Sequence, residues 1–418
     1  MNRTEIMQKA DDVIKDQKLR EMFKKCFMST LETSLKVEGD KTYIITGDIN
    51  AMWLRDSSCQ VNHYLKLMKD DQDLQNKIKG LIRSQIEYVL LDPYANAFLN
   101  TEDVPREYHD TTIMKPYVWE RKFELDSLCY PVKLAYQYYK ETNDTTIFDK
   151  QYLYFIHTIL DVFETEQYHS QKSSYTFERD MAKVWNLRKT ETLQNHGHGF
   201  DTRYTGMVWS AFRPSDDACA LNYNIPGNMF CSVILSYLVE ILRDLYHDER
   251  LVERIIDLKF QIDYGIELFG TYLHPKYGKI YAYETDGYGN HILMDDANVP
   301  SLLSLPYLEY CHEDDPIYQN TRRFISVSYT HLDVYKRQMR DWLIEHGVAA
   351  SDIEAETGSF NTRQNLGDVY KRQVRDTMYG DLISGMTRAL EAMLLATAVA
   401  IGVYTGLKMA AMMGGIAL

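Results

Sequence analysis

The sequence predicts an all-α fold, built as an α/α barrel or toroid whose functional site lies at one end of its helices. Apolar residues recur at the i, i+3, i+4 and i+7 spacing of core-facing helices through most of the first 325 residues. Strand signals are few, and long loops carrying polar and aromatic motifs join the helices in pairs. Because such loops collect at one end of a barrel of helix pairs, the motifs in them should form one site.

The helical stripes can be followed in order along the chain. The first three lie in residues 19–27, 61–68 and 74–89. Their expected core-facing residues are Leu19, Met22, Phe23, Cys26, Phe27, Val61, Tyr64, Leu65, Met68, Leu74, Ile78, Leu81, Ile82 and Val89. Later helices are expected near residues 125–141, 152–166, 229–246 and 250–269. Two β-rich segments, 41–46 and 279–283, are expected to form short hairpin pieces.

Composition narrows the class of protein. The chain has 418 residues, 45% hydrophobic and 25% charged, as in ordinary globular proteins. A net charge of −14 without a basic stripe argues against a nucleic-acid partner. The charged N-terminus lacks the apolar core of a signal peptide, so a cytoplasmic protein is expected. Reduced, buried thiols are expected of six scattered cysteines: Cys26, Cys59, Cys129, Cys219, Cys231 and Cys311.

The C-terminal part breaks the helical pattern. Six residues, Asp-Val-Tyr-Lys-Arg-Gln, occur at 333–338 and again at 368–373 between dissimilar flanks. In a true repeat the apolar positions recur while surface residues drift, so both copies are interpreted as seams of an artificial join, the first spanning 326–338 and the second 367–373. The alternative is a genuine duplicated surface motif.

The segments beyond the seams differ in character. Residues 339–366 resemble a fragment of a SanA-like α/β domain, and residues 374–418 resemble the membrane part of a threonine/serine exporter. Residues 392–407 carry no charge, a stretch slightly short for a membrane span. Both segments are interpreted as foreign to the domain at residues 1–325, for which no membrane association is expected.

A pair of neighbouring carboxyl groups, Asp216 and Asp217, is the most informative motif. It follows Arg213 and Pro214 and a run that contains Tyr204 and Trp209. Aromatic planes for sugar C–H faces and charged groups for hydroxyls and proton transfer are what a sugar site needs. A carboxyl group held beside another carboxylate and near aromatic rings should have a raised pKa. The alternative is that the pair only caps a following helix.

Three other segments carry candidate site residues. Trp53 and Arg55 could supply a stacking plane and a forked donor, whereas Asp56 or Ser57 could serve as a helix N-cap. Residues 119–128, which include Glu120, place four charges before an apolar helix; taken alone, such a run is more often solvated. Residues 295–301, which include Asp296, repeat the Asp-Asp-Ala string, with capping as the default interpretation.

Taken together, residues 48–61, 119–131, 206–219 and 283–305 resemble glycoside hydrolase family 125 in order and spacing. The Trp-Leu-Arg-Asp-Ser and Arg-Pro-Ser-Asp-Asp-Ala strings are its most characteristic motifs, and the resemblance covers about residues 10–325. It departs at Asn50, where the family usually has proline. The resemblance implies an (α/α)6 barrel and a metal-independent, inverting exo-α-1,6-mannosidase that needs no cofactor.

The same resemblance implies roles for individual residues. Asp216 is the expected general acid, which protonates the leaving glycosidic oxygen of an α-mannoside oligosaccharide. The expected sugar-binding positions are Trp53, Arg55, Asp56, Glu120, Arg213, Asp217 and Asp296.

The general base is expected to be missing. An inverting enzyme needs a second carboxylate about 6.5–9.5 Å from the acid. In the family this glutamate lies in a Met-His-Glu segment, a string absent from the sequence. Glu354 and Glu356 lie in foreign-looking sequence and are not assigned that role. The chain is therefore expected to be inactive, and two alternatives stay open: a mannoside-binding or inert remnant, and a membrane-anchored glycosidase.

One loop carries two histidines that are candidate metal ligands. His196 and His198 lie two residues apart in a glycine-flanked loop and could bind a metal if a third ligand converged. Histidines in such loops more often have no metal or face substrate, so no metal is expected here.

Overall fold

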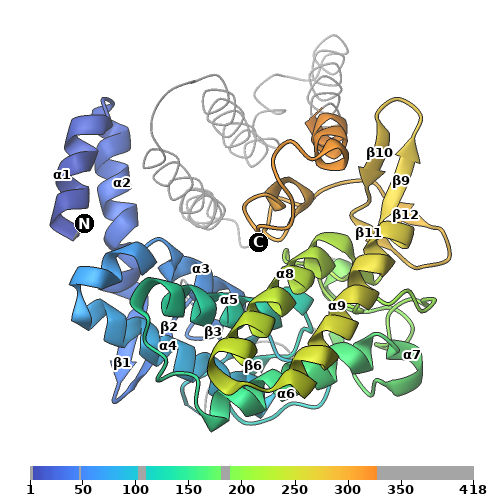
Figure 1. Ribbon diagram of the computed structural model, residues 1–418, viewed down its shortest axis with the longest axis horizontal. Coiled ribbons are helices and arrows are strands. Elements are labelled where there is room, and N and C mark those ends of the chain that lie inside the picture. The colour runs from blue at the N-terminus through green and yellow to red at the C-terminus, as the bar shows by residue number, and fades with distance from the viewer. Residues whose placement is uncertain (1–2, 47–48, 102–109, 180–188, 327–418) are drawn as a thin grey trace, which may run out of the picture. The chain divides into compact units, whose positions relative to one another are not determined.

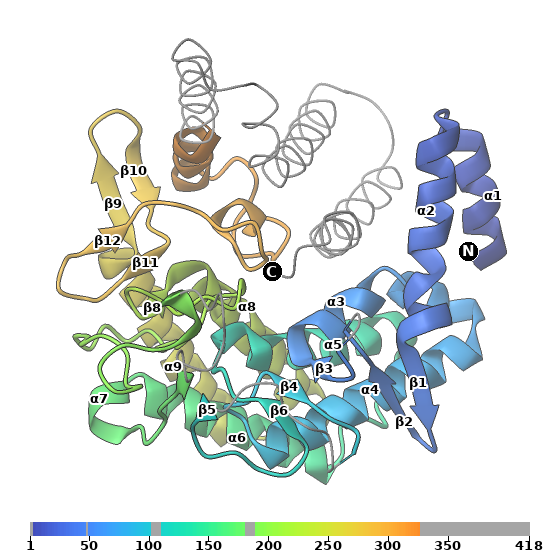
Figure 2. The same cartoon turned by 180° about the vertical axis from the view of Figure 1, so that it is seen from behind.

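A computed structural model describes residues 3–46, 49–101, 110–179 and 189–326 (Figures 1 and 2). The chain divides into two compact units, one formed by Met1–Ile6 and Thr30–Phe324 and the other by Met7–Ser29 and Ile325–Leu418. All candidate site residues belong to the first unit. The predicted seams, from residue 327 onward, and the segments 339–366 and 374–418 lie outside the described residues.

Helices are the main secondary structure of the described residues, as the sequence predicts. They are α1 (Arg3–Val13), α2 (Gln17–Ser29), α3 (Leu54–Asn62), α4 (Gln72–Leu91), α5 (Leu125–Thr142), α6 (Lys150–Glu166), α7 (His169–Lys172), α8 (Ile225–Ile241) and α9 (Glu249–Phe269). The helices predicted near 125–141, 152–166, 229–246 and 250–269 are confirmed as α5, α6, α8 with its continuation η4 (Leu242–Tyr246), and α9.

The apolar stripes differ in how well they predict burial. Every expected core residue between Val61 and Val89 is buried. In α2, only Phe23 and Phe27 are buried, whereas Leu19 and Met22 are about half exposed. Helical spacing tells which residues share a face, but it does not tell how much of that face another element covers.

Within the first unit the helices form two layers. Helix α5 packs against α3 on one side and α8 on the other, whereas α4 packs on α6 behind them and α9 packs on α8. Both views show α3, α5 and α8 side by side, with α4, α6 and α9 on their other side (Figures 1 and 2). Helix α9 also lies close to the loop that contains Thr205. This requires glycine at position 265, because a Cβ there would lie 2.5 Å from the Thr205 carbonyl oxygen. The double layer is the arrangement expected of α/α helix pairs.

Short strands accompany the predicted helices. The two predicted pieces are β2 (Lys41–Ile44), which pairs with β1 (Leu35–Glu38), and β10 (Gly278–Tyr281), which pairs with β9 (Thr271–His274). The strands that the sequence did not predict are β3 (Met52–Trp53), β4 (Ala97–Phe98), β5 (Asp110–Thr111), β6 (Val118–Glu120), β7 (Glu178–Arg179), β8 (Tyr223–Asn224), β11 (Glu284–Thr285) and β12 (His291–Ile292). Strands of two or three residues are too short to show a period of two.

These short sheets hold the loops that carry the motifs. Strands β3, β4 and β6 form one sheet in the order β3-β4-β6, which brings Trp53 and Glu120 to the same small scaffold. Strand β11 lies between β8 and β12 and places Glu284 next to the chain that leads into α8. Strands β5 and β7 pair Asp110 with Arg179.

One helical stretch in the described residues, Ile225–Tyr246, is long and apolar enough to cross a membrane. In the structure, 83% of its most apolar 18-residue stretch is buried against other elements. A buried core helix meets the same criteria of length and composition, and the position of α8 between α5 and α9 is that of a core helix.

The cysteines are free thiols in the structure. Cys129, Cys219 and Cys231 are buried, as predicted, whereas Cys26, Cys59 and Cys311 are partly exposed.

Candidate functional site

Asp216 lies in a tight turn that is closed by an isolated β-bridge. Phe212 pairs with Ala218, and the Arg213 amide donates to the Asp217 carbonyl oxygen at 2.8 Å. The backbone of Asp216 has a φ of 66°, in the left-handed region that few residues other than glycine adopt. Such a conformation costs free energy and persists where the surrounding structure enforces it.

The helix-capping alternative for Asp216 and Asp217 is wrong. The next helix, α8, begins at Ile225, and its N-cap is Asn224, whose side chain accepts from the Gly227 amide at 2.8 Å. Asp56 and Ser57 are not N-caps either, because α3 begins at Leu54. Sequence spacing showed polar residues ahead of apolar helices, but it did not show where the first helical turn begins.

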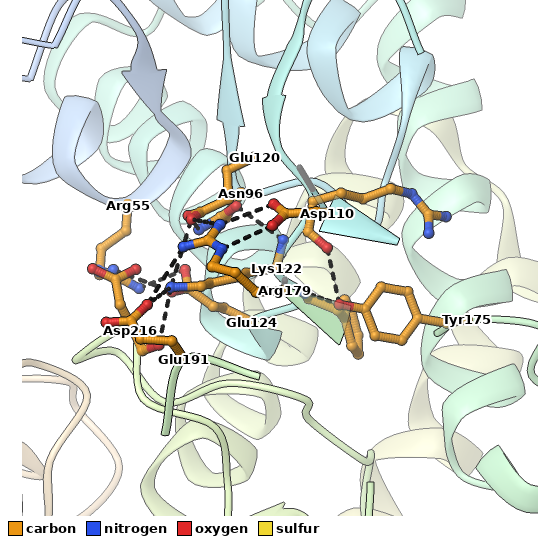
Figure 3. A network of polar contacts seen from close by, with 12 residues as sticks. Arg55, Asn96, Asp110, Glu120, Lys122, Glu124, Tyr175, Arg179, Glu191 and Asp216 are labelled. Atoms are coloured by element: carbon orange, nitrogen blue, oxygen red, sulfur yellow. Dashed lines mark hydrogen bonds and ion pairs between the residues drawn. The ribbon is translucent and has the colours of Figure 1, made fainter. Parts of the chain in front are cut away.

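Residues 119–128 are not a solvated charged run; the structure buries them. Glu120 is 8% exposed, Lys122 2% and Glu124 1%. Lys122 Nζ donates to the backbone carbonyl of Asp216 at 3.2 Å and lies 3.1 Å from Glu191. This segment therefore forms one wall of the site and holds the turn that carries Asp216 (Figure 3).

Glu120 is surrounded by donors. It accepts from Arg179 Nη2 at 2.7 Å and from Asn96 Nδ2 at 3.0 Å, and Lys122 Nζ lies 3.5 Å away. Arg179 also forms a bidentate ion pair with Asp110. Burial alone would raise the pKa of Glu120, but Lys122 and Arg179 lower it to about 2.

Arg55 is buried among carboxyl groups. Its Nη1 donates to Glu124 at 2.8 Å and to Asp126 at 3.1 Å, and its Nε lies 3.6 Å from Asp56. The guanidinium therefore organises acidic side chains of the protein, and little of it is left to hold a sugar. Asp56 keeps about a third of its side-chain surface exposed, so its carboxylate can meet a hydroxyl group.

Burial dominates the electrostatics of Glu124 and Asp216. It raises the pKa of Glu124 well above the ordinary range of glutamate, with Arg55 opposing and Asp216 and Asp126 adding to the effect. Burial also raises the pKa of Asp216; Glu120 adds to this, whereas Lys122, Arg55 and Glu124 oppose it. A raised pKa is the property required of a general acid near neutral pH.

Arg213 is held by a residue that the sequence did not single out. Its guanidinium pairs with Glu284, which also accepts the amides of Ala220 and Leu221 at 3.1 and 3.0 Å. Arg213 lies 5.6 Å from the ring of Tyr283, whose hydroxyl contacts Asp296 at 3.4 Å. Glu284 thus links the Asp216 turn to β11.

The remaining candidates lie at the edges of this network. Asp217 and Asp296 are partly exposed. The neighbouring Asp295 accepts the amides of Leu302 and Leu303, but the N-cap of the short helix Leu302–Ser304 is Ser301. Trp53 is 8% exposed and packs with Ala51, Ala97 and Leu99, which leaves little ring surface for stacking.

The aromatic plane expected at Trp209 is not available to a sugar. Trp209 is fully buried and stacks on His169, with ring centroids 3.6 Å apart. Its place in the sequence next to the site motif is a consequence of core packing.

The histidine pair does not form a metal site with other described residues. His196 and His198 are both exposed, and no group of three or more potential ligands converges anywhere in the described ranges.

With this geometry in place, comparison with known proteins is informative. The model of the metal-independent α-mannosidase family, GH125, matches residues 16–331. The chain belongs to this family. The resemblance to glycoside hydrolase family 125 inferred from the sequence is thereby confirmed.

Two relatives show how far the similarity extends. The meiotically up-regulated gene 157 protein of Schizosaccharomyces pombe is 40% identical over 330 residues, which cover 75% of this chain and 64% of the yeast protein. The chain thus spans less than two thirds of that relative. A Streptococcus pneumoniae metal-independent α-mannosidase, solved as a non-productive complex with α-1,6-mannobiose, is 43% identical with a TM-score of 0.73, covering 77% of this chain and 75% of the other.

Proposed function

We propose that this chain derives from an exo-α-mannosidase that removes terminal mannose from α-1,6-linked mannosides by single displacement, on an (α/α)6 barrel. Family membership supports hydrolysis of α-mannosides, and the GH125 relative was solved with α-1,6-mannobiose. The observation that carries the proposal is Asp216: a carboxyl group of raised pKa on a constrained turn, next to partly exposed Asp56 and Asp217.

In this reaction Asp216 donates its proton to the glycosidic oxygen as the bond to the anomeric carbon breaks. A water molecule attacks from the opposite face, and a second carboxylate takes its proton. Asp56, Asp217 and Asp296 are the partly exposed carboxylates available for sugar hydroxyls, whereas Arg55 and Arg213 hold the acidic side chains in place.

We further propose that this chain binds mannosides and turns them over slowly. The family resemblance puts the base in a Met-His-Glu segment, and that string does not occur in the sequence. Loss of a general base typically costs about 10²- to 10⁴-fold in rate. We propose a cytoplasmic location, supported by the free cysteines of the described residues.

Calorimetric titration of the full chain with α-1,6-mannobiose, together with an assay for released mannose, tests both parts. Binding with slow release is the expected result, and gentiobiose, a β-linked glucose disaccharide, serves as the control that should not bind. Absence of binding would contradict the assignment of the site, and rapid release of mannose would contradict the missing base.

A further inference from the structure

The carboxyl groups of Glu124 and Asp216 lie together in the site and have too few donors between them. The Asp216 Oδ1 atom is buried and has no hydrogen-bond partner. The Glu124 side chain is entirely buried and lies beside that of Asp216 (Figure 3). Ionisation of both carboxyl groups is unfavourable in such a position, because like charges repel and neither carboxylate can donate a hydrogen bond.

The hydrogen bonds of Glu124 show which of its oxygens is free to carry that proton. Arg55 Nη1 and Ser127 Oγ both donate to Glu124 Oε2, each at 2.8 Å. Oε1 has only a 3.5 Å contact with Arg55 Nη2, at the limit of a hydrogen bond. Oε2 is therefore fixed as an acceptor, and Oε1 is left available for a proton.

The charges of the whole network point the same way. Three cationic side chains, Arg55, Lys122 and Arg179, contact six carboxyl groups. These six are Asp56, Asp110, Glu120, Glu124, Asp126 and Glu191. Asp216 is a seventh acid in the same electrostatic neighbourhood, and no ion pair within the described residues neutralises its carboxyl group. Full ionisation would leave four negative charges in excess in a largely buried region, so protons must remain bound there at neutral pH.

We propose that Glu124 and Asp216 share one proton and that Glu124 is the positioning residue that holds this proton beside the acid at neutral pH. The inference rests on the proposed function, in which Asp216 is the proton donor. In the free protein the proton lies in the hydrogen bond between the two carboxyl groups. When the glycosidic bond breaks, Asp216 gives a proton to the leaving oxygen, and the pair becomes doubly ionised. Arg55 and Ser127 stabilise the Glu124 carboxylate until solvent returns a proton.

The decisive variants are Glu124→Gln and, as a matched control, Asp126→Asn. Both remove a carboxyl partner of Arg55 near the start of α5, but only Glu124 also meets Asp216. In Glu124→Gln the amide can still donate to Asp216 but cannot supply a proton. Asp216 should then lose its proton at lower pH than in the wild-type chain, because the shared titration of the pair is replaced by that of one group.

Carbon-13 NMR of the full chain, labelled at aspartate carboxyl carbons, measures this without substrate. The Asp216 signal is assigned by its loss in Asp216→Asn. Its titration should shift to lower pH by about one unit or more in Glu124→Gln, and by much less in Asp126→Asn. An unchanged titration in Glu124→Gln, or an equal shift in both variants, would overturn the proposal.

A second readout uses the reaction with azide, which needs no general base. The rate loss in Glu124→Gln should be about tenfold larger at pH 7.5 than at pH 5.5, whereas a structural defect would lower the rate equally at both. An equal loss at both values would overturn the proposal. If no variant binds α-1,6-mannobiose, the proposed function fails, and the NMR titration still decides whether the proton is shared.

Discussion

Glu120 and Glu124 lie four residues apart on either side of Lys122, and the structure gives them opposite acid strengths. Both are buried. Glu120 meets two cations, Lys122 and Arg179, and its pKa is lowered to about 2. Glu124 meets Arg55 alone and shares it with Asp56 and Asp126, and its pKa is raised well above the ordinary range.

The difference teaches that the local ratio of cations to carboxyl groups, and not burial alone, decides which acid keeps its proton. Pairs of titratable groups whose environments separate their pKa values are typical of acid–base sites. In this site the ionised member, Glu120, faces Arg179 and holds structure together. The member of raised pKa, Glu124, lies beside Asp216, where the proposed reaction needs a proton.

The largest expected effect is on the acid itself. Asp216→Asn removes the proton that the leaving sugar requires, so the rate of α-1,6-mannobiose cleavage should fall by about 10²- to 10⁴-fold. With a 2,4-dinitrophenyl α-mannoside, whose leaving group needs little protonation, the loss should be small. Asp314→Asn, at a largely exposed carboxylate, is the control and should behave as the wild-type chain. Equal losses on both substrates would argue against Asp216 as the acid.

The role of Glu120 can be tested by removing one of the two cations that contact it. Arg179→Met leaves Glu120 and Asp110 buried without their shared partner, and breaking such a buried pair costs about 3–5 kcal/mol of unfolding free energy. Urea unfolding measures the loss.

Arg254→Met is the matched control for that experiment. Arg254 also pairs with two carboxylates, but the Asp161 side chain is 69% exposed and that of Glu164 40%. Its loss should cost no more than about 1 kcal/mol. Similar losses of unfolding free energy in the two variants would show that the buried network stabilises the fold no more than the exposed one.

The smallest effect is a pH dependence of stability. The pKa of Glu120 is lower in the folded chain than its ordinary value of 4.5, so its contribution is present above that value and is lost as pH falls toward 2. Between pH 5 and pH 3 the wild-type chain should lose about 2 kcal/mol through this group. In Glu120→Gln, urea unfolding at the two pH values should show a correspondingly smaller loss. An unchanged loss would mean that Glu120 is not the depressed acid.

Much of the fold could be predicted because periodicity is local. The stripe at 74–89 identified a buried face correctly because it lies within α4 alone. The residues predicted at 61–68 are also buried, but they span the end of α3, a turn and a short 3-10 helix, Leu65–Asp70, instead of one α-helix. The motif strings identified the family and the segment that carries Asp216. The paired short strands β3, β4 and β6 could not be predicted, because their register is set by pairs of residues up to 46 positions apart.

The site was predicted less completely for the same reason. Glu124 and Asp126 lie in a segment whose charges look solvated in sequence, and only the tertiary fold brings Arg55 onto them. Glu284 gave no signal, because its partner Arg213 is 71 residues away. Trp209 gave a false signal: a tryptophan beside a polar motif suits a sugar platform, but here it fills the core.

Azide trapping tests the central claim most directly. Azide can replace the water molecule and needs no base: its nitrogen bonds to the anomeric carbon from the face opposite the leaving group, while Asp216 protonates the departing sugar. The chain should convert α-1,6-mannobiose and azide to β-mannosyl azide and mannose, at a rate that rises with azide concentration and vanishes in Asp216→Asn. Absence of the azide adduct from a chain that binds the disaccharide, or its undiminished formation in Asp216→Asn, would contradict the account.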